Sequence, residues 1–374
     1  MNYLGSSNIE AFGVTARVFH PREMCVAHEA RWEELRGERD CYASPFYSPG
    51  FTRAVGEVRE DARVALFECA GKTVGFLPLH VVRGRIAKPI GAHLNDYHGA
   101  ILGRSAEIGY SRLLDAADID AYDFNHLPQE LGARLSLSRD GGSSPQMDVS
   151  DGYGAYLEER GKSFRRGHSA VKRKLRKMAR EMGELSFEFA SNNPAHFRAH
   201  AWMRSALYRK AGNPARFGEG WEGEVFERLR EIRSPSFRTV LNVLKAGEKV
   251  VAAHFGLVSN GVMHWWFPAY AESAACYSPG LALIDFCARE AQEEGVAIID
   301  FGRGDERYKR FFASREVPLL AGSSVRQGSP SAALRKLVRG TVGPLQAVLP
   351  QGAQSFPQRV ADKLATGVAI PRYG

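Results

Sequence analysis

The stretch from Arg238 to Phe312 most constrains the fold, because its hydrophobic pattern changes from a two-residue period to a helical one and back. Two alternating runs joined by Ala246-Gly247-Glu248 predict a β-hairpin, and a third run predicts a further strand. A helix, a buried strand and a glycine-rich loop follow, so an α/β unit is expected. The expected segments are strands over 238–245, 249–258, 262–270 and 296–301, a helix from 279 to near 295, and a loop over 302–309.

The helix entrance and the glycine-rich loop are two candidate ligand sites. A helix begun by Pro279-Gly280 presents backbone N–H groups with little side-chain cover, and these donors suit a phosphate. The loop from Asp300 to Lys309 leaves a buried strand at its carboxyl end, where α/β sheets place ligands. An ordinary strand–loop–helix connection explains the same residues without a ligand, so both interpretations stay open here.

The composition indicates a globular chain with room for two domains. Of its 374 residues, 44% are hydrophobic and 25% are charged. We find no apolar run that predicts a membrane span, no secretory leader, and no C-x-x-C pair among the five cysteines. We therefore expect no metal site and no disulfide framework, and we expect the protein to reside in the reducing cytoplasm.

The net charge of +8 is concentrated in one segment, Lys162 to Arg180, which holds nine Lys/Arg and no acid and leaves the remainder at about −1 (8 minus 9). Its apolar residues recur at helical spacing, which predicts a helix with one buried face. The outer face of this helix is either simply solvated or binds phosphate groups. Those phosphates could belong to a nucleotide-linked acceptor, a CoA, a tRNA or an anionic membrane. The near absence of aromatic residues disfavours nucleic acid.

The first half of the chain echoes the second. The hairpin pattern of 63–74, turned by Ala70-Gly71-Lys72, aligns by residue type with that of 238–250, a match that either a repeat or chance can produce. We expect the two halves to join through the polar run Asp140–Pro145, treated as flexible. A weakly helical, basic segment over 332–348 lies in the final part of the chain and is a candidate for peripheral membrane contact.

Three groups of residues in this order resemble the GNAT acyltransferase superfamily. They are Val250-Val251-Ala252-Ala253-His254-Phe255, then Tyr277-Ser278-Pro279-Gly280, then Ile299-Asp300-Phe301-Gly302-Arg303-Gly304-Asp305-Glu306-Arg307-Tyr308-Lys309. The nearer resemblance is to the branch that holds polysaccharide-biosynthesis (cellulose-type) acetyltransferases and Fem-like aminoacyl transferases. The resemblance covers residues 150–325 well and the first 150 weakly.

The resemblance implies an α/β (α+β) fold of two tandem GNAT-like domains, each with a mixed, mostly antiparallel sheet flanked by helices. The implied divisions are a degenerate N-terminal domain over 1–150, an acyltransferase domain over 151–327 and a C-terminal helix and tail over 328–374. The implied activity is acyl transfer, N-acetyl transfer included, from acetyl-CoA or another acyl-CoA. The implied acceptor is a small-molecule or a nucleotide- or lipid-linked sugar, or another cell-envelope or exopolysaccharide precursor.

The residues that match the family's donor site are Tyr277, Ser278, Pro279, Gly280 and Leu281. The usual Gln/Arg-x-x-Gly-x-Gly/Ala pattern is not present, because Gly280 is the only glycine there. That departure keeps an aminoacyl-tRNA donor, as used by Fem-like enzymes, as an alternative. A non-catalytic assembly module of polysaccharide synthesis is the alternative from another class.

Acyl transfer also needs a base, a proton donor and a group that stabilises the oxyanion. His254 is a candidate base because imidazole titrates near neutrality, although a structural histidine fits the same pattern. Asp300 and Asp305 are further candidates, with backbone capping as the other role for Asp300. The resemblance adds Tyr308, as a proton donor to the leaving thiolate, and Lys309. Candidates on the acceptor side are Asp96, Tyr97, His98 and Arg303.

Overall fold

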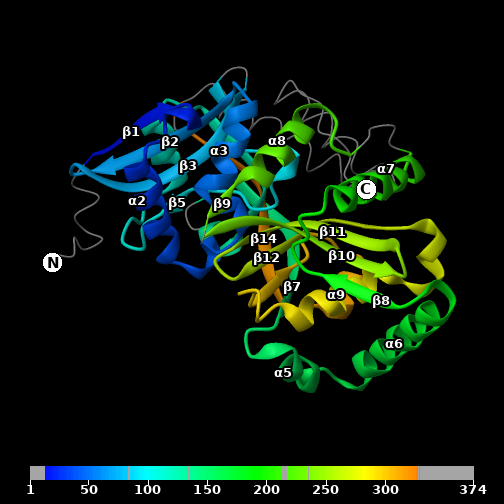
Figure 1. The fold of residues 1–374 in the computed structure, drawn as a ribbon. Coiled ribbons are helices and arrows are strands. Elements are labelled where there is room, and N and C mark those ends of the chain that lie inside the picture. The colour runs from blue at the N-terminus through cyan, green and yellow to red at the C-terminus, as the bar shows by residue number, and fades with distance from the viewer. Residues whose placement is uncertain are drawn as a thin grey trace, which may run out of the picture. The chain divides into compact units, whose positions relative to one another are not determined.

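The computed structural model describes residues 13–82, 85–132, 135, 137–212, 217–234, 236–326 and 328. It has a mixed α/β fold, drawn in Figure 1, and divides into two compact units. Unit 1 contains the described residues up to Glu38, then Glu60–Asp140 and the described residues from Leu320; unit 2 contains Arg39–Arg59 and Gly141–Leu319. The predicted C-terminal helix over 332–348 and the tail after 328 lie outside the described residues.

Unit 1 is built on strands in the spatial order β1-β2-β3-β4-β6. Strands β1 to β4 pair antiparallel in sequence, whereas β4 and β6 pair parallel, with Ile86 opposite Ala121. Its elements are β1 (Val14–Phe19), α2 (Val26–Gly37), β2 (Ala62–Cys69), β3 (Lys72–Val82), β4 (Ile86–Pro89), β5 (Ile101–Leu102), α4 (Tyr110–Ala116) and β6 (Ala121–Pro128).

Unit 2 has the strand order β7-β13-β12-β11-β10-β8, and β12 and β13 form its parallel pair. Two of the boundaries between the units fall within β7 (Leu137–Asp148) and β14 (Arg315–Val325), and the other two fall after Glu38 and after Arg59. The other elements of unit 2 are α3 (Pro49–Val58), α5 (Gly152–Glu159), α6 (Lys162–Met182), β8 (Leu185–Glu188), α7 (Pro194–Lys210), α8 (Gly220–Glu231), β9 (Arg233–Ser234), β10 (Phe237–Ala246), β11 (Lys249–Ser259), β12 (Val262–Tyr270), α9 (Pro279–Glu290), β13 (Ile298–Asp300) and α10 (Arg307–Phe312).

The two units repeat one topology. In each, a hairpin is followed by a third antiparallel strand, a crossover helix and a strand parallel to the third: β2, β3, β4, α4 and β6 in unit 1, and β10, β11, β12, α9 and β13 in unit 2. A parallel pair needs such a crossover, because its strands cannot be joined by a tight turn. The hairpin match in the sequence therefore reflects a repeat.

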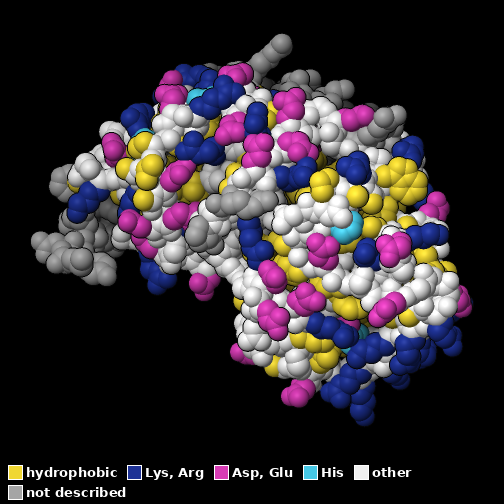
Figure 2. Space-filling view, viewed as in Figure 1, with side chains coloured by type: hydrophobic (Ala, Val, Ile, Leu, Met, Phe, Trp, Pro, Cys, Tyr) yellow, Lys and Arg dark blue, Asp and Glu magenta, His cyan; other side chains and the backbone are white. Residues whose placement is uncertain are grey.

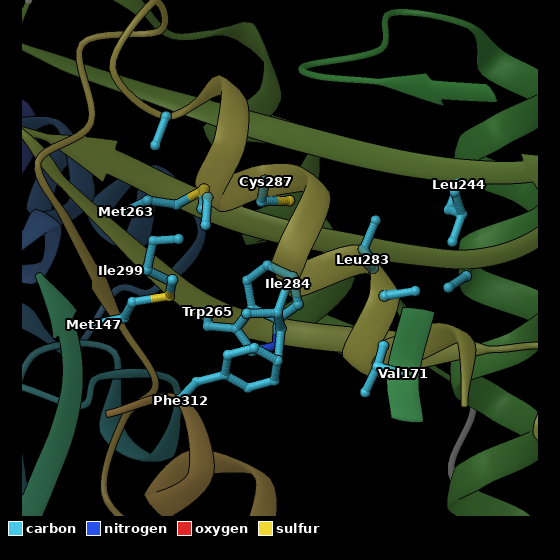
Figure 3. Packing of buried hydrophobic residues seen from close by; sticks show 14 of the residues in the cluster. Met147, Val171, Leu244, Met263, Trp265, Leu283, Ile284, Cys287, Ile299 and Phe312 are labelled. Carbon is cyan, nitrogen blue, oxygen red and sulfur yellow. The ribbon is translucent and has the colours of Figure 1, made fainter. Parts of the chain in front are cut away.

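Helix α9 lies at the centre of the main core of unit 2 (Figure 3). Leu283 and Cys287 are fully buried, and Ile284 faces Trp265 and Phe312 in the close-up. On the other face of the same sheet, α7 packs against β11 and β12, as Figure 1 shows. Burying α9 in this way fixes the place and direction of its first turn.

Most predicted elements of the second half are confirmed, but the loop expected over 302–309 already becomes helix α10 at Arg307, and the flexible run predicted over 140–145 is a strand. The hairpin, the third strand and the basic helix form as expected, the helix as α6 with Phe164, His168, Val171, Leu175 and Met178 buried. The run Asp140–Pro145 contains a boundary between the units, between Asp140 and Gly141, as predicted, but it is the middle of β7 and not a flexible linker. Its polar groups have partners there, because Ser144 donates to Asp300 and the Pro145 carbonyl accepts from the Phe301 N–H.

Candidate functional site

The parallel pair of unit 2 is short. Strand β13 pairs with β12 at three positions, the last of which places His264 opposite Asp300. Strand β13 ends there, while β12 continues to Tyr270. The backbone edge of β12 after His264 therefore has no β13 partner. Such an edge can bind an extended ligand through backbone hydrogen bonds.

Helix α9 begins with an open first turn. Ser278 occupies the N-cap position in the left-handed region with φ 58°, and its side chain makes no capping bond. Pro279 has no N–H to satisfy. A Cβ built on Gly280 meets only Tyr270 Cδ1, at 3.9 Å. Space therefore exists beside Gly280, whereas the N–H groups of Leu281 and Ala282 already donate to the Ser278 carbonyl.

Residues of the basic helix border this turn. Lys174 Nζ donates to Ser278 Oγ at 2.8 Å, and Lys177 Nζ lies 5.9 Å from the ring centre of Tyr277. The Tyr277 hydroxyl donates to Glu181 at 2.6 Å, and this bond raises the pKa of Tyr277 to about 12. The donor-site candidates 277–281 thus lie together beside two lysine ammonium groups, which suits an anionic ligand.

Asp300 anchors the start of the glycine-rich loop. Its fully buried carboxylate accepts hydrogen bonds from Ser144 Oγ (2.6 Å), Gln146 Nε2 (2.6 Å) and the Gly302 N–H (2.8 Å). These donors occupy both carboxylate oxygens. The geometry therefore favours the role of fixing the loop backbone over that of a base, although the base assignment itself stays a prediction.

Lys309 holds the same loop from its other end. Its buried ammonium group donates to the carbonyls of Gly302 (3.3 Å) and Arg303 (2.9 Å) and lies 3.2 Å from Glu306 Oε2. Gly304 has φ +149°, and a Cβ there would lie 2.1 Å from Glu306 Oε2 and 2.8 Å from Lys309 Nζ. Because Gly304 has no side chain, Lys309 and Glu306 can form their ion pair directly against the loop backbone.

The remaining predicted residues of this loop differ in exposure. The side chain of Asp305 is 98% exposed, and its Oδ2 lies 3.9 Å from a guanidinium nitrogen of Arg310. The carboxylate therefore faces solvent. Tyr308 is half-buried, and burial raises the pKa of its phenol above the usual range, which keeps it protonated. Arg303 is half-buried on the loop between Asp300 and Asp305. The structure thus brings Asp300, Arg303, Tyr308 and Lys309 into one loop and its following helix.

His254 is fully buried in the sheet. Its Nε2 accepts from the Trp266 N–H at 3.2 Å, its Nδ1 lies 3.2 Å from Asn242 Nδ2, and its ring stacks on Trp265 at 3.8 Å. Burial lowers its pKa well below the usual value, so the ring is neutral. This environment is that of a residue supporting β12, and a catalytic role for His254 stays a prediction.

Two side chains that the sequence argument missed support the same strand. The register of β11 and β12 shifts between Phe255 and Leu257, which bulges β12. His200 Nε2 donates to the Phe267 carbonyl at 2.7 Å, and burial lowers the His200 pKa to about 4. Arg204 donates to the Pro268 carbonyl at 3.0 Å. Both lie on α7, and nothing in their spacing indicated these contacts.

The acceptor-side candidates Asp96, Tyr97 and His98 lie in unit 1. Tyr97 and His98 are buried, and His98 Nδ1 accepts from the backbone N–H groups of Asn125 and His126. Asp96 Oδ1 lies 3.8 Å from His126 Nε2. His126, a third residue that the sequence did not point to, thus forms a pair with Asp96 within unit 1.

The part of the chain that the structure describes contains neither a metal-binding cluster nor a membrane-spanning helix. Within the described ranges, no cluster of three His, Cys, Asp or Glu has the geometry to hold a metal ion. None of the helices in that part of the chain combines the length and the apolar character needed to cross a bilayer.

Comparison with known proteins agrees with this architecture. Residues 163–310 match the family model described as Acetyltransferase (GNAT) domain. A search of curated proteins found no match. The structure is similar to that of FemX (TM-score 0.54, 10% identity, 86% of this chain and 99% of that one). It is also similar to the C-terminal domain (DUF2156) of a putative lysylphosphatidylglycerol synthetase from Agrobacterium fabrum (TM-score 0.52, 16% identity, 83% and 96%).

At these identities the two structures show the fold alone. The chain has the α/β GNAT fold that the sequence predicts, and the family match supports the prediction of a GNAT-type acyltransferase. The resemblance to the cellulose-type branch, the acyl donor and the acceptor stay predictions.

Proposed function

We propose that this protein transfers an acyl group from an acyl-CoA thioester to an amine or hydroxyl of a sugar or another cell-envelope precursor. The observation that carries the proposal is the open first turn of α9 at Gly280, bordered by Lys174. The helix follows β12 after a short 3-10 helix (Glu272–Tyr277), and the start of this helix is the position at which GNAT-like enzymes bind the CoA pyrophosphate.

The donor would bind in two parts. The Gly280 N–H and the positive end of α9 would face the pyrophosphate, with Lys174 contributing a charge-assisted hydrogen bond. The extended part of the donor would lie along β12 beyond His264, where β13 has ended. His254, His200 and Arg204 would keep that strand in shape, because each bonds a backbone group of the bulged segment.

The loop after β13 would supply the groups at the reacting end. Tyr308 would donate a proton to the leaving thiolate; burial keeps that proton on the phenol in the resting enzyme and also makes the phenol a weaker acid, so an approaching thiolate would have to draw the proton off. Lys309 would fix the loop, since its three ammonium protons face Gly302, Arg303 and Glu306. Arg303 would contact the acceptor. The acceptor class follows from the family resemblance.

A second candidate donor is an aminoacyl-tRNA. The likeness to FemX and the departure of 277–281 from the usual GNAT glycine pattern favour it. In that case the lysines beside α9 would contact the terminal phosphates of the tRNA.

The test is calorimetric titration of acetyl-CoA and longer acyl-CoA into the wild-type protein and the Gly280→Trp variant. We expect binding of one molecule per chain and a loss of at least about 100-fold in affinity in the variant, because the indole fills the space before the helix. The matched control is Gly154→Trp in α5, where a Cβ meets nothing within 4 Å. Equal weakening in the control, or binding of no acyl-CoA by the wild type, would refute the CoA proposal; the latter would favour tRNA or a non-catalytic role.

A further inference from the structure

The free edge of β12, the part that extends past the end of β13, lacks two of the N–H donors that a strand edge normally presents. The Ala271 N–H donates to the Val251 carbonyl of β11, and successive strand residues turn their backbone groups to opposite edges, so the Pro268 carbonyl faces the free edge. Pro268 itself has no N–H, and the Trp266 N–H donates to His254 at 3.2 Å. Neither residue can therefore bond the carbonyl oxygen of a bound thioester.

A guanidinium group lies at this place on the free edge. Arg204 of α7 donates from Nη1 to the Pro268 carbonyl at 3.0 Å. Its guanidinium carbon lies 4.9 Å from the ring centre of Tyr208 and 5.5 Å from that of Phe267. The carbonyl and the two rings hold the guanidinium in one orientation. Arg204 therefore brings N–H donors to the part of the edge that lacks them.

Most of the hydrogen-bonding capacity of Arg204 is unused. Within the part of the chain that the structure describes, the Pro268 carbonyl is the acceptor that this side chain bonds, and no carboxylate pairs with it. Its Nε lies out of contact with water and has no acceptor in that same part of the chain. A half-buried arginine is normally paired with an acid. An arginine held in this way is suited to bind a ligand oxygen that carries negative charge.

Arg204 also lies near Tyr308, the proposed acid for the leaving thiolate. Burial raises the pKa of the Tyr308 phenol and the charge of Glu306 raises it further, whereas the charge of Arg204 lowers it. A charge acts in this way only on a group close to it. The guanidinium and the phenol therefore lie near each other, beside the strand edge proposed to hold the thioester.

The charges that would meet the donor's phosphates lie elsewhere. Figure 2 shows Lys and Arg side chains gathered where Figure 1 places α6, whose Lys174 borders the start of α9. Helix α7 packs on the other face of the sheet, against β11 and β12. A change at Arg204 should thus alter binding at the reacting end of a donor and leave the contacts of its phosphates unchanged.

We propose that Arg204 is a catalytic residue, which donates hydrogen bonds to the thioester carbonyl oxygen and stabilises the negative charge that this oxygen acquires; the inference rests on the proposed function. The acceptor's amine or hydroxyl attacks the thioester carbon, and the π electron pair of the carbonyl moves onto the oxygen beside Arg204. When that pair returns, the carbon–sulfur bond breaks and the thiolate takes the Tyr308 proton. The proton that the acceptor loses then restores the phenol through solvent.

The test compares two stable derivatives of CoA by calorimetry. Carboxymethyl-CoA carries a carboxylate one carbon beyond the sulfur, whereas carbamoylmethyl-CoA has the same shape and no charge there. We expect the wild type to bind the carboxymethyl compound about tenfold more tightly, as one charge-assisted hydrogen bond provides. Arg204→Gln should lower that affinity about tenfold, and so abolish the preference, while changing the affinity for the carbamoylmethyl compound less than about threefold.

The matched control is Arg198→Gln, which removes an exposed charge from the same helix and should change both affinities less than about twofold. Equal weakening of both compounds in Arg204→Gln would show that Arg204 only supports β12. A wild type without a preference for the carboxymethyl compound would also overturn the inference, whether or not the variant folds. Binding of neither compound by the wild type would refute the proposed function, and this inference with it.

Discussion

Helices α4 and α9 occupy the same place in a repeated strand order, but they begin differently. Helix α4 starts with buried Tyr110, whose hydroxyl accepts from the Ala100 N–H, so its entrance is filled by its own side chain. Helix α9 starts with Pro279-Gly280 and has open space before its first turn. The repeat therefore supplied two equivalent positions, and the residues at the helix entrance decide which of them can bind a ligand.

The parallel strands that follow the two helices differ in the same way. Strand β6 runs for eight residues to Pro128, whereas β13 stops after three at Asp300 and turns into a loop. The buried carboxylate at that stop takes the place of further strand pairing, because it accepts from the Gly302 N–H and from two side chains of β7. In unit 2, strand pairing therefore stops early, and the Asp300 carboxylate holds the backbone of the following loop in place of further backbone hydrogen bonds between strands.

The largest effect should come from removing this anchor. We expect Asp300→Asn to lower the free energy of unfolding by about 3–5 kcal/mol, because an amide must turn an NH₂ group toward one of three donors. Asp305→Asn, whose side chain is 98% exposed, should change it by less than about 0.5 kcal/mol. Urea denaturation of both variants measures the difference. A small effect of Asp300→Asn would mean that β13 ends for a reason other than this carboxylate.

The sequence predicted local features of unit 2 well. Alternation over 238–258 predicted the hairpin, and the three- and four-residue spacing from Phe164 to Met178 predicted which face of α6 is buried. Both patterns depend only on the local period of the backbone, which sets the face of each side chain.

The partners of the site residues could not be predicted in this way. Gln146 and Asp300 are 154 residues apart, and Lys174 and Ser278 are 104 apart. A period gives the face of an element but not the element it meets. The run 140–145 was correctly predicted to join the two units, but its conformation was predicted wrongly for the same reason. Glycine, serine and proline usually mark a loop, whereas here Ser144 and Pro145 bond Asp300 and Phe301, at the end of β13.

Helices α4 and α9 are also held in place by different kinds of contact. This difference predicts that mutations in the two helices change the stability of the fold with different pH dependence. Leu113 and Leu114 bury α4 through apolar contacts, whereas Asp285 of α9 is bonded by His168 (2.7 Å), Tyr153 and Arg289 (2.5 Å). Burial alone would raise the Asp285 pKa, but these hydrogen bonds and the Arg289 charge hold it below its usual value.

A depressed carboxyl pKa stabilises the fold above the unfolded pKa of about 3.9 and loses that contribution as the pH falls through the folded value. We therefore expect Asp285→Asn to cost about 1–3 kcal/mol at neutral pH, with the difference from wild type shrinking below about pH 4. Leu113→Ala should cost about 2–5 kcal/mol with no such pH dependence. Thermal unfolding across pH 3–7 measures both. Parallel curves for the two variants would show that the charged cluster does not distinguish α9 from α4.

The smallest predicted effect concerns the charge at the open entrance. Lys174→Gln should weaken acyl-CoA binding about three- to tenfold, because it removes one charge-assisted contact beside Ser278 and leaves the helix N-terminus in place. Lys172→Gln removes the same charge from the opposite flank of α6, where no contact with α9 forms, and should change affinity less than twofold. Calorimetry at low and moderate salt should also show a weaker salt dependence for Lys174→Gln alone. If the two variants bind acyl-CoA equally well, affinity depends on the overall charge of the basic helix and not on the contact of Lys174 with Ser278. The difference between α9 and α4 then depends on Gly280 alone.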